Sequence, residues 1–174
     1  WKANVKKLIF LGSSCMYPKE CPQPMKEESL LMGKLEPTNE AYAIAKIAGW
    51  QMCKAYNKQY NTKFVTVIPT NLYGPNDQFD ALNAHLIPAL ITKCYEAKKN
   101  DDKEVTVWGT GKPLRDFLFV DDAAEAVIMI MKKDTTEETN EIINIGSGKD
   151  VTVKEIVEIT KECVGFTGKI VWDT

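Results

Sequence analysis

Short apolar runs alternate along the chain with segments whose apolar residues recur every three or four positions. The runs are rich in β-branched residues and predict buried strands at 5–11, 64–68, 105–108, 142–145 and 169–172. The longer segments predict four helices. The first has about twenty residues and begins after Asn39, and the second covers 86–97. The third runs from Asp121 or Asp122 to 131, and the fourth covers 152–164 with Thr152 as its cap. This alternation predicts an α/β fold with a parallel sheet in at least the first half.

The first of these helices follows the cap candidates Pro37, Thr38 and Asn39. Its apolar spacing predicts one buried stripe made of Ala45, Ala48, Gly49, Met52, Cys53 and Tyr56. The stretch 12–36 before it holds three prolines and reads as a long loop. Long loops in compact domains are usually functional.

Composition narrows the classes of protein that the chain can belong to. It has 44% hydrophobic and 26% charged residues and a net charge of −2, which fits a globular core and disfavours nucleic acid as a partner. No apolar run approaches the ~18 residues of a membrane span. Five cysteines without a C-x-x-C pair argue against a disulfide framework and a metal site, so we expect a reducing, cytoplasmic setting.

Tyr42 and Lys46 form a Y-x-x-x-K pair on the predicted helix. A spacing of four puts both side chains on one face, about one turn apart. A nearby ammonium stabilises a phenolate, so such a pair can donate a proton to a carbonyl. The pattern also arises by chance, as an amphipathic tyrosine beside an exposed lysine.

Gly12-Ser13-Ser14-Cys15 follows the first predicted strand at its carboxyl end, where open α/β sheets bind ligands. If the backbone stays extended past Gly12, Ser13 and Cys15 point to the same side. The serine hydroxyl can then bond the substrate oxygen that Tyr42 protonates. The alternative for Cys15 is a small buried residue.

Three further side chains are candidates for binding or proton transfer. His85 is the only histidine and precedes a helix after a polar loop, while Arg115 is the only arginine and suits forked contact with a diphosphate. Trp108 offers a flat surface for a sugar or base. Each has a structural alternative: a structural histidine, a surface arginine and a core tryptophan. Two G-x-G-K segments, at 109–112 and 146–149, complete no phosphate-binding fingerprint and read as turns.

Four runs together, FLGSSCMYP, LEPTNEAYAIAKIAG, PTNLYGPND and LRDFLFVDDAA, resemble the GDP-L-fucose synthases, a family of extended short-chain dehydrogenases/reductases. The resemblance implies a partial Rossmann-like doubly wound sheet at 1–80, with elements returning near 116–145. Residues 81–174 would form part of a small α/β substrate domain. It also implies NADPH as cofactor, GDP-4-dehydro-6-deoxy-D-mannose as substrate, and 3,5-epimerisation followed by 4-reduction. For the full-length protein it implies a homodimer built on the helix that carries Tyr42, which this chain alone would form more weakly.

The resemblance also assigns roles to residues. It makes Ser13, Tyr42 and Lys46 the reductase triad, and Cys15 and His85 the epimerisation acid/base pair. The cofactor would lie along Leu11, Gly12, Ser13, Ser14, Lys46, Pro69, Thr70, Asn71, Leu72 and His85. The GDP-sugar would be held by Asn71, Lys93, Trp108 and Arg115.

The chain departs from this family at both ends. It does not contain the first strand, glycine-rich turn and helix of the cofactor domain, or the segment that follows Thr174 in the substrate domain. We therefore expect this polypeptide alone to bind NADPH weakly and to show no turnover. Two alternatives stay open: another sugar-nucleotide epimerase or dehydratase, which would not need Cys15 and His85, or a non-catalytic binding module.

Overall fold

The computed structural model describes residues 2–80, 84–133 and 142–174, and these divide into two units. Unit 1 comprises Trp1–Leu72 and Asp121–Gly146, and unit 2 comprises Tyr73–Val120 and Ser147–Thr174. The domain boundary expected after residue 80 meets residues 81–83, which lie outside the described part. Each unit is described by itself.

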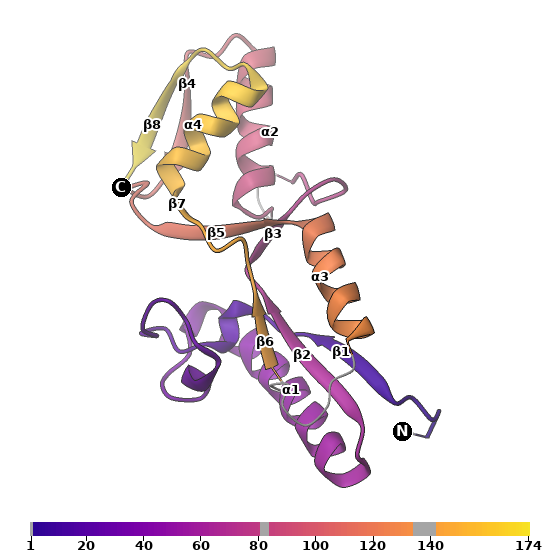
Figure 1. Ribbon diagram of the computed structural model, residues 1–174. Coiled ribbons are helices and arrows are strands. Elements are labelled where there is room, and N and C mark those ends of the chain that lie inside the picture. Colours follow the sequence, from indigo (N-terminus) through magenta and orange to yellow (C-terminus); the bar gives the residue numbers. More distant parts are fainter. Residues whose placement is uncertain (1, 81–83, 134–141) are drawn as a thin grey trace. The chain divides into compact units, whose positions relative to one another are not determined.

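Unit 1 is built on a parallel sheet in the order β1-β2-β6 (Figure 1). The strands are β1 (Lys7–Leu11), β2 (Lys63–Pro69) and β6 (Ile142–Ile145). The central strand β2 is buried from Phe64 to Ile68, as expected for a parallel strand covered on both faces. Because the strands run in one direction, their carboxyl ends share one edge of the sheet.

Helix α1 (Glu40–Tyr60) packs against this sheet at very short range. Gly49 faces the ring of Phe10 on β1, and a Cβ built at Gly49 would lie 2.8 Å from two ring carbons. The Lys46 ammonium lies 5.4 Å from the centroid of the same ring. A residue without a side chain is therefore needed at position 49 for the helix to approach β1.

The buried stripe of α1 differs from the predicted one. Cys53 is buried as expected and Gly49 and Tyr56 are half-buried, but Ala45, Ala48 and Met52 are exposed. The buried positions are instead Ala43, Trp50 and Cys53. The helix is apolar on two faces and contacts the sheet with only one of them, so periodicity alone selected the wrong side for half of the stripe.

The segment between β1 and α1 belongs to the hydrophobic core of unit 1. It contains three short 3₁₀ turns, η1 (Ser14–Met16), η2 (Glu27–Ser29) and η3 (Pro37–Asn39). Its apolar side chains pack with Trp50, Ile68 and Ile142, and they are Met16, Tyr17, Cys21 and Leu30. The predicted loop is thus a packed part of the fold.

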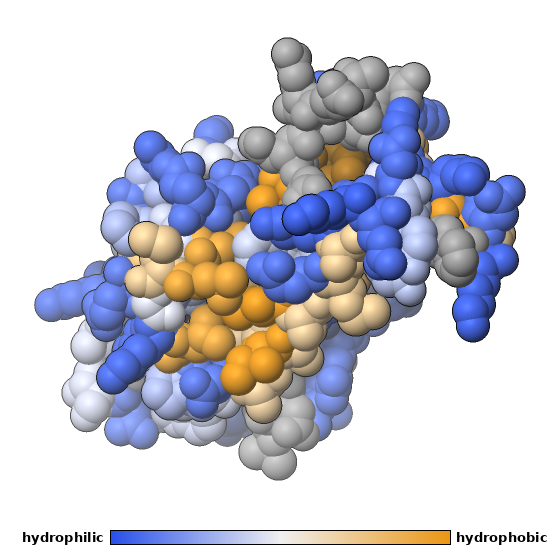
Figure 2. All heavy atoms as spheres, turned by 90° about the horizontal axis from the view of Figure 1, so that it is seen from below, coloured by the Kyte–Doolittle hydropathy of each residue, from blue (hydrophilic) through white to orange (hydrophobic). Residues whose placement is uncertain are grey.

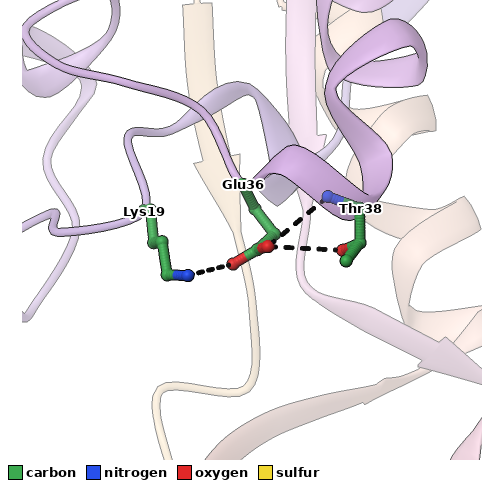
Figure 3. A network of polar contacts seen from close by, with 3 residues as sticks. All are labelled: Lys19, Glu36 and Thr38. Atoms are coloured by element: carbon green, nitrogen blue, oxygen red, sulfur yellow. Dashed lines mark hydrogen bonds and ion pairs between the residues drawn. The ribbon is translucent and has the colours of Figure 1, made fainter.

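The two ends of this segment are tied together by polar contacts (Figure 3). The Lys19 amide donates to the Lys34 carbonyl at 2.9 Å, and the Lys19 ammonium lies 3.1 Å from the Glu36 carboxylate. Glu36 also accepts from the amide and hydroxyl of Thr38, both at 3.4 Å. The Lys19 contact and these bonds lower the pKa of the Glu36 carboxyl. The segment therefore closes on itself immediately before α1.

Unit 2 contains a second core between two helices and a pair of parallel strands. Its elements are α2 (Leu86–Lys99), β4 (Glu104–Trp108), α4 (Val153–Val164) and β8 (Lys169–Asp173). The core side chains include Leu90, Cys94, Val105, Val107 and Val157. Thr152 caps α4 as predicted, because its hydroxyl accepts from the Glu155 amide while the Glu155 carboxylate accepts from the Thr152 amide.

Three short strands form a sheet that the sequence did not predict, in the order β3-β5-β7. They are β3 (Asn71–Tyr73), β5 (Leu114–Phe119) and β7 (Asp150–Thr152), and β5 pairs with β7 in antiparallel register. Helix α3 (Val120–Lys132) follows β5 directly, so Asp121 and Asp122 lie in its first turn and neither is the cap.

Two further observations concern membrane-spanning helices and the cysteines. None of the helices in the described ranges is long and apolar enough to cross a membrane. All five cysteines are free thiols; Cys15 is half-buried, Cys163 is exposed, and Cys21, Cys53 and Cys94 are buried.

The Gly49 contact gives a prediction about stability. Helix propensity alone would make Gly49→Ala stabilising by about 0.5–1 kcal/mol. Because the new methyl group collides with the Phe10 ring, we expect Gly49→Ala to lower the free energy of unfolding by about 1–3 kcal/mol instead. Urea unfolding followed by circular dichroism measures this. The exposed neighbour Ala48→Gly is the control, with a loss of about 1 kcal/mol from propensity alone.

Candidate active site

The carboxyl end of β1 leads into the first group of candidate residues. Gly12 is buried and its amide donates to the Val67 carbonyl at 2.8 Å. Ser13 is still extended, with φ −157° and ψ 149°, but Ser14–Met16 form the turn η1. The extended backbone therefore ends at Ser13, so the condition under which Ser13 and Cys15 would point to the same side is not met.

Tyr42 and Lys46 lie on the first turns of α1, beside the end of β1. The Lys46 ammonium donates to the Leu11 carbonyl at 2.8 Å and lies 5.7 Å from the centroid of the Tyr42 ring. Tyr42 is 50% exposed, so its ring is open to solvent or a ligand. Lys46 is thus fixed between the last residue of β1 and the phenol.

Cys15 is held from two sides. Its amide donates to the Ser13 hydroxyl at 3.3 Å, and its sulfur accepts from the Asn39 side-chain amide at 3.1 Å. Asn39 ends η3 and immediately precedes α1, so the thiol lies beside the amino end of the helix that carries Tyr42. Sequence reasoning considered Asn39 only as a helix cap.

A partly buried polar network anchors this region to β6. The Tyr17 hydroxyl donates to the Asn144 side-chain oxygen at 2.6 Å, and the Asn144 side-chain nitrogen donates to the Met25 carbonyl at 3.1 Å. The backbone amide of Asn144 donates to the Glu27 carboxylate at 2.9 Å. Burial raises the pKa of Tyr17 to about 12. The sequence signal for this network was a single asparagine inside the apolar run 142–145.

The residues expected to bind the cofactor follow the ends of β1 and β2. Leu11 is exposed and Ser14 half-buried, while Pro69 closes β2 and the Thr70 amide donates to the Ile145 carbonyl at 2.9 Å. Asn71 and Leu72 continue into β3. Hydroxyls, backbone amides and one ammonium at the carboxyl edge of a parallel sheet suit a dinucleotide. The residues present therefore fit part of a nicotinamide cofactor.

The remaining candidates belong to unit 2. His85 is exposed and occupies the position before α2, as its sequence context predicted, and its side chain makes no capping bond. The Lys93 ammonium lies 4.8 Å from the ring centroid of Trp108, which is 72% exposed. The core alternative for Trp108 is therefore wrong. Arg115 is also exposed, and its guanidinium donates to the Leu114 carbonyl at 2.7 Å.

Comparison with known proteins shows the family to which the chain belongs. The model of the NAD dependent epimerase/dehydratase family matches residues 1–146. The chain belongs to this family. The fold is accordingly a Rossmann-like α/β fold, and the resemblance inferred from the four sequence runs is confirmed.

Individual relatives of the epimerase/dehydratase family agree with this. GDP-L-fucose synthase 1 of Arabidopsis thaliana is 53% identical over 173 residues, covering 99% of this chain and 53% of that protein. A GDP-L-fucose synthetase structure from Naegleria fowleri bound to NADP has a TM-score of 0.86 at 35% identity, covering 97% and 53%. A GDP-6-OMe-4-keto-L-xylo-heptose reductase structure from C. jejuni has a TM-score of 0.89 at 37% identity, covering 98% and 60%. The chain spans about half the length of the curated relatives it matches.

The Tyr17 network predicts a pH dependence of stability. Tyr17→Phe removes the donor from buried Tyr17 to half-buried Asn144, so we expect a loss of about 1–2 kcal/mol in the free energy of unfolding at neutral pH. Between pH 10 and 12 the unfolded chain releases the Tyr17 proton while the folded protein keeps it. Wild-type stability therefore falls in this window relative to Tyr17→Phe, by about 1.4 kcal/mol per pH unit.

Urea unfolding of both proteins from pH 8 to pH 11 measures this difference, which should shrink above pH 10. Tyr95→Phe, at an exposed tyrosine of α2, is the control for the loss of a tyrosine hydroxyl. A constant difference for Tyr17→Phe would contradict the burial argument.

Proposed function

We propose that the chain carries out GDP-L-fucose synthesis as the catalytic part of an NADPH-dependent epimerase/reductase. The substrate would be GDP-4-dehydro-6-deoxy-D-mannose, epimerised at carbons 3 and 5 and then reduced at the 4-keto group. One observation carries the proposal: the Lys46 ammonium donates a hydrogen bond to the Leu11 carbonyl at the end of β1 and lies beside the exposed ring of Tyr42. The likeness to GDP-L-fucose synthase 1 supports the substrate class. We also propose a cytoplasmic location.

The reduction assigns a task to each residue of the triad. NADPH, when bound, supplies the hydride. Tyr42 donates its phenolic proton to the ketone oxygen, and the Lys46 ammonium stabilises the phenolate that remains. Ser13 donates a second hydrogen bond to the same oxygen, which stabilises the charge that develops there.

Cofactor binding uses the carboxyl edge of the unit 1 sheet. The residues proposed to lie along NADPH are Leu11, Gly12, Ser13, Ser14, Lys46, Pro69, Thr70, Asn71 and Leu72, together with His85. Substrate binding uses Asn71, Lys93, Trp108 and Arg115. Arg115 would pair with the diphosphate, and Trp108 with its Lys93 neighbour would offer a flat, cationic surface.

The epimerisation requires a base and an acid that act from different sides of the sugar ring. The adjacent ketone acidifies the hydrogens at carbons 3 and 5, so a thiolate or an imidazole can remove them. We propose Cys15 and His85 for these two roles, from their match to the family motif. The hydroxyl of Ser13 remains available for the ketone oxygen.

A second candidate is the reduction of a different GDP-4-keto sugar. The TM-score of 0.89 to the heptose reductase favours it, since that protein carries a related substrate in its name. Ser13, Tyr42 and Lys46 would serve this reaction equally well. The two candidates differ in the sugar that is reduced and in whether protons exchange at its carbon atoms before reduction.

A chimeric enzyme tests the proposal. In it, this chain replaces the matching 173 residues of the Arabidopsis synthase. We expect NADPH consumption with GDP-4-dehydro-6-deoxy-D-mannose, and a loss of about 100-fold or more in Tyr42→Phe.

Deuterium uptake at carbons 3 and 5 from heavy water distinguishes the candidates. Cys15→Ser should abolish uptake while hydride transfer continues, and Cys163→Ser, an exposed cysteine on α4, is the matched control. A chimera that consumes NADPH without uptake would favour the second candidate.

We also propose that the protein is a homodimer through the exposed apolar face of α1, defined by Ala41, Ile44, Ala45, Ala48 and Met52. Ile44 and Met52 are 53% and 61% exposed, and the alanines between them allow close helix approach. Figure 2 shows one face of the molecule, on which apolar side chains gather. Outside α1, the exposed large apolar side chains among the described residues of unit 1 are Val5, Leu11, Leu31, Met32, Ile128, Met129 and Met131.

The dimer proposal predicts that charge on this face keeps the chain monomeric. Light scattering over a concentration series should show a dimer for the wild-type chain and a monomer for Met52→Lys, because the ammonium would be buried in the contact. Ile159→Lys, at a similarly exposed position on α4, is the control and should dimerise like wild type. A wild-type chain that stays monomeric at every concentration would contradict the proposal.

A further inference from the structure

Asn39 occupies the capping position of α1 but does not cap the helix. Asparagine is favoured there because its side-chain oxygen accepts from a free backbone amide of the first turn. Here the side chain makes no capping hydrogen bond. Its nitrogen donates to the sulfur of Cys15, 24 residues earlier in the chain, at 3.1 Å.

The side-chain oxygen of Asn39 is buried and has no hydrogen-bond partner among the described residues. A buried unpaired carbonyl costs stability. The contrast is Thr152, which uses its hydroxyl to cap α4. The Asn39 side chain thus neither caps α1 nor accepts a hydrogen bond through its oxygen. Among the described residues, its side-chain hydrogen bond is the one that its nitrogen donates to the Cys15 sulfur.

We propose that Asn39 is a positioning residue for Cys15, which orients the sulfur and stabilises its thiolate form. An amide nitrogen only donates hydrogen bonds, so its contact is strongest with a sulfur that carries negative charge. The amino end of α1 adds a positive dipole end beside the same atom. The Cys15 amide, bonded to the Ser13 hydroxyl, fixes the backbone under the sulfur.

The inference rests on the proposed role of Cys15 in epimerisation. In that step the thiolate takes a proton from carbon, an S–H bond forms, and the electron pair of the broken C–H bond passes to the enolate of the ketone. Stabilised thiolate makes the base available, and a sulfur fixed by Asn39 keeps it in one orientation.

Alkylation of the 174-residue chain tests the inference without substrate or cofactor. Iodoacetamide reacts with thiolates, and peptide mass spectrometry follows each cysteine separately. Asn39→Asp keeps the size and the capping ability of the side chain, but it removes the donor and adds negative charge. We expect the alkylation rate of Cys15 to fall about tenfold or more.

Internal controls report on folding in the same sample. Buried Cys53 on α1 should stay protected, and exposed Cys163 on α4 should react at the wild-type rate. Asn61→Asp adds the same charge at the opposite end of α1 and should leave Cys15 unchanged. Asn39→Gln retains an amide donor and should restore part of the rate, which a purely structural role would not predict.

If Cys53 becomes reactive in Asn39→Asp, that variant is partly unfolded. Asn39→Ala then replaces it in the test, because it removes the donor without adding charge. A Cys15 rate equal to or above wild type in a folded Asn39→Asp or Asn39→Ala protein would overturn the inference. The outcome is independent of the proposed function, since the chimera can fail to turn over while alkylation of Cys15 still slows.

Discussion

The hydrogen bond from the Lys46 ammonium to the Leu11 carbonyl fixes the amino-terminal part of α1 on β1. It forms because Gly49, one turn later, lets the helix approach the Phe10 ring. The same approach sets the position of Tyr42, one turn earlier, and of Asn39 before the helix. One helix-to-strand contact therefore determines where a phenol, an ammonium and a thiol lie around the end of one strand.

Rigidity in the segment between β1 and α1 comes from side chains far away in the sequence. Asn144 on β6 accepts from Tyr17, donates to Met25 and bonds Glu27 through its backbone amide. The Lys19 and Glu36 contact closes the other side of the segment. Ser13 and Cys15 thus extend from a packed core, and this would favour the proposed catalysis, because the reacting groups would then need little reorganisation.

The sequence predicted elements whose signal is local. The Thr152 capping box and the buried run of β2 were correct, and the Tyr42 and Lys46 pair lies on one helix face as expected. It did not predict β3, β5 and β7. The strands β3 and β7 have only three residues each, and the pairing of this sheet depends on partners far apart in the sequence. The choice between the two apolar faces of α1, and the turn that redirects Cys15, likewise depend on tertiary packing.

The proposed chemistry divides unequally between the two units. Ser13, Tyr42 and Lys46, which would serve reduction, all belong to unit 1 and are positioned by contacts within it. Epimerisation would need Cys15 from unit 1 and His85 from unit 2. The contacts that position the proposed reductase triad are the Lys46 bond to the Leu11 carbonyl and the approach of Gly49 to the Phe10 ring. Because both contacts join α1 to β1 within unit 1, the geometry of this triad follows from the packing of one helix on one strand.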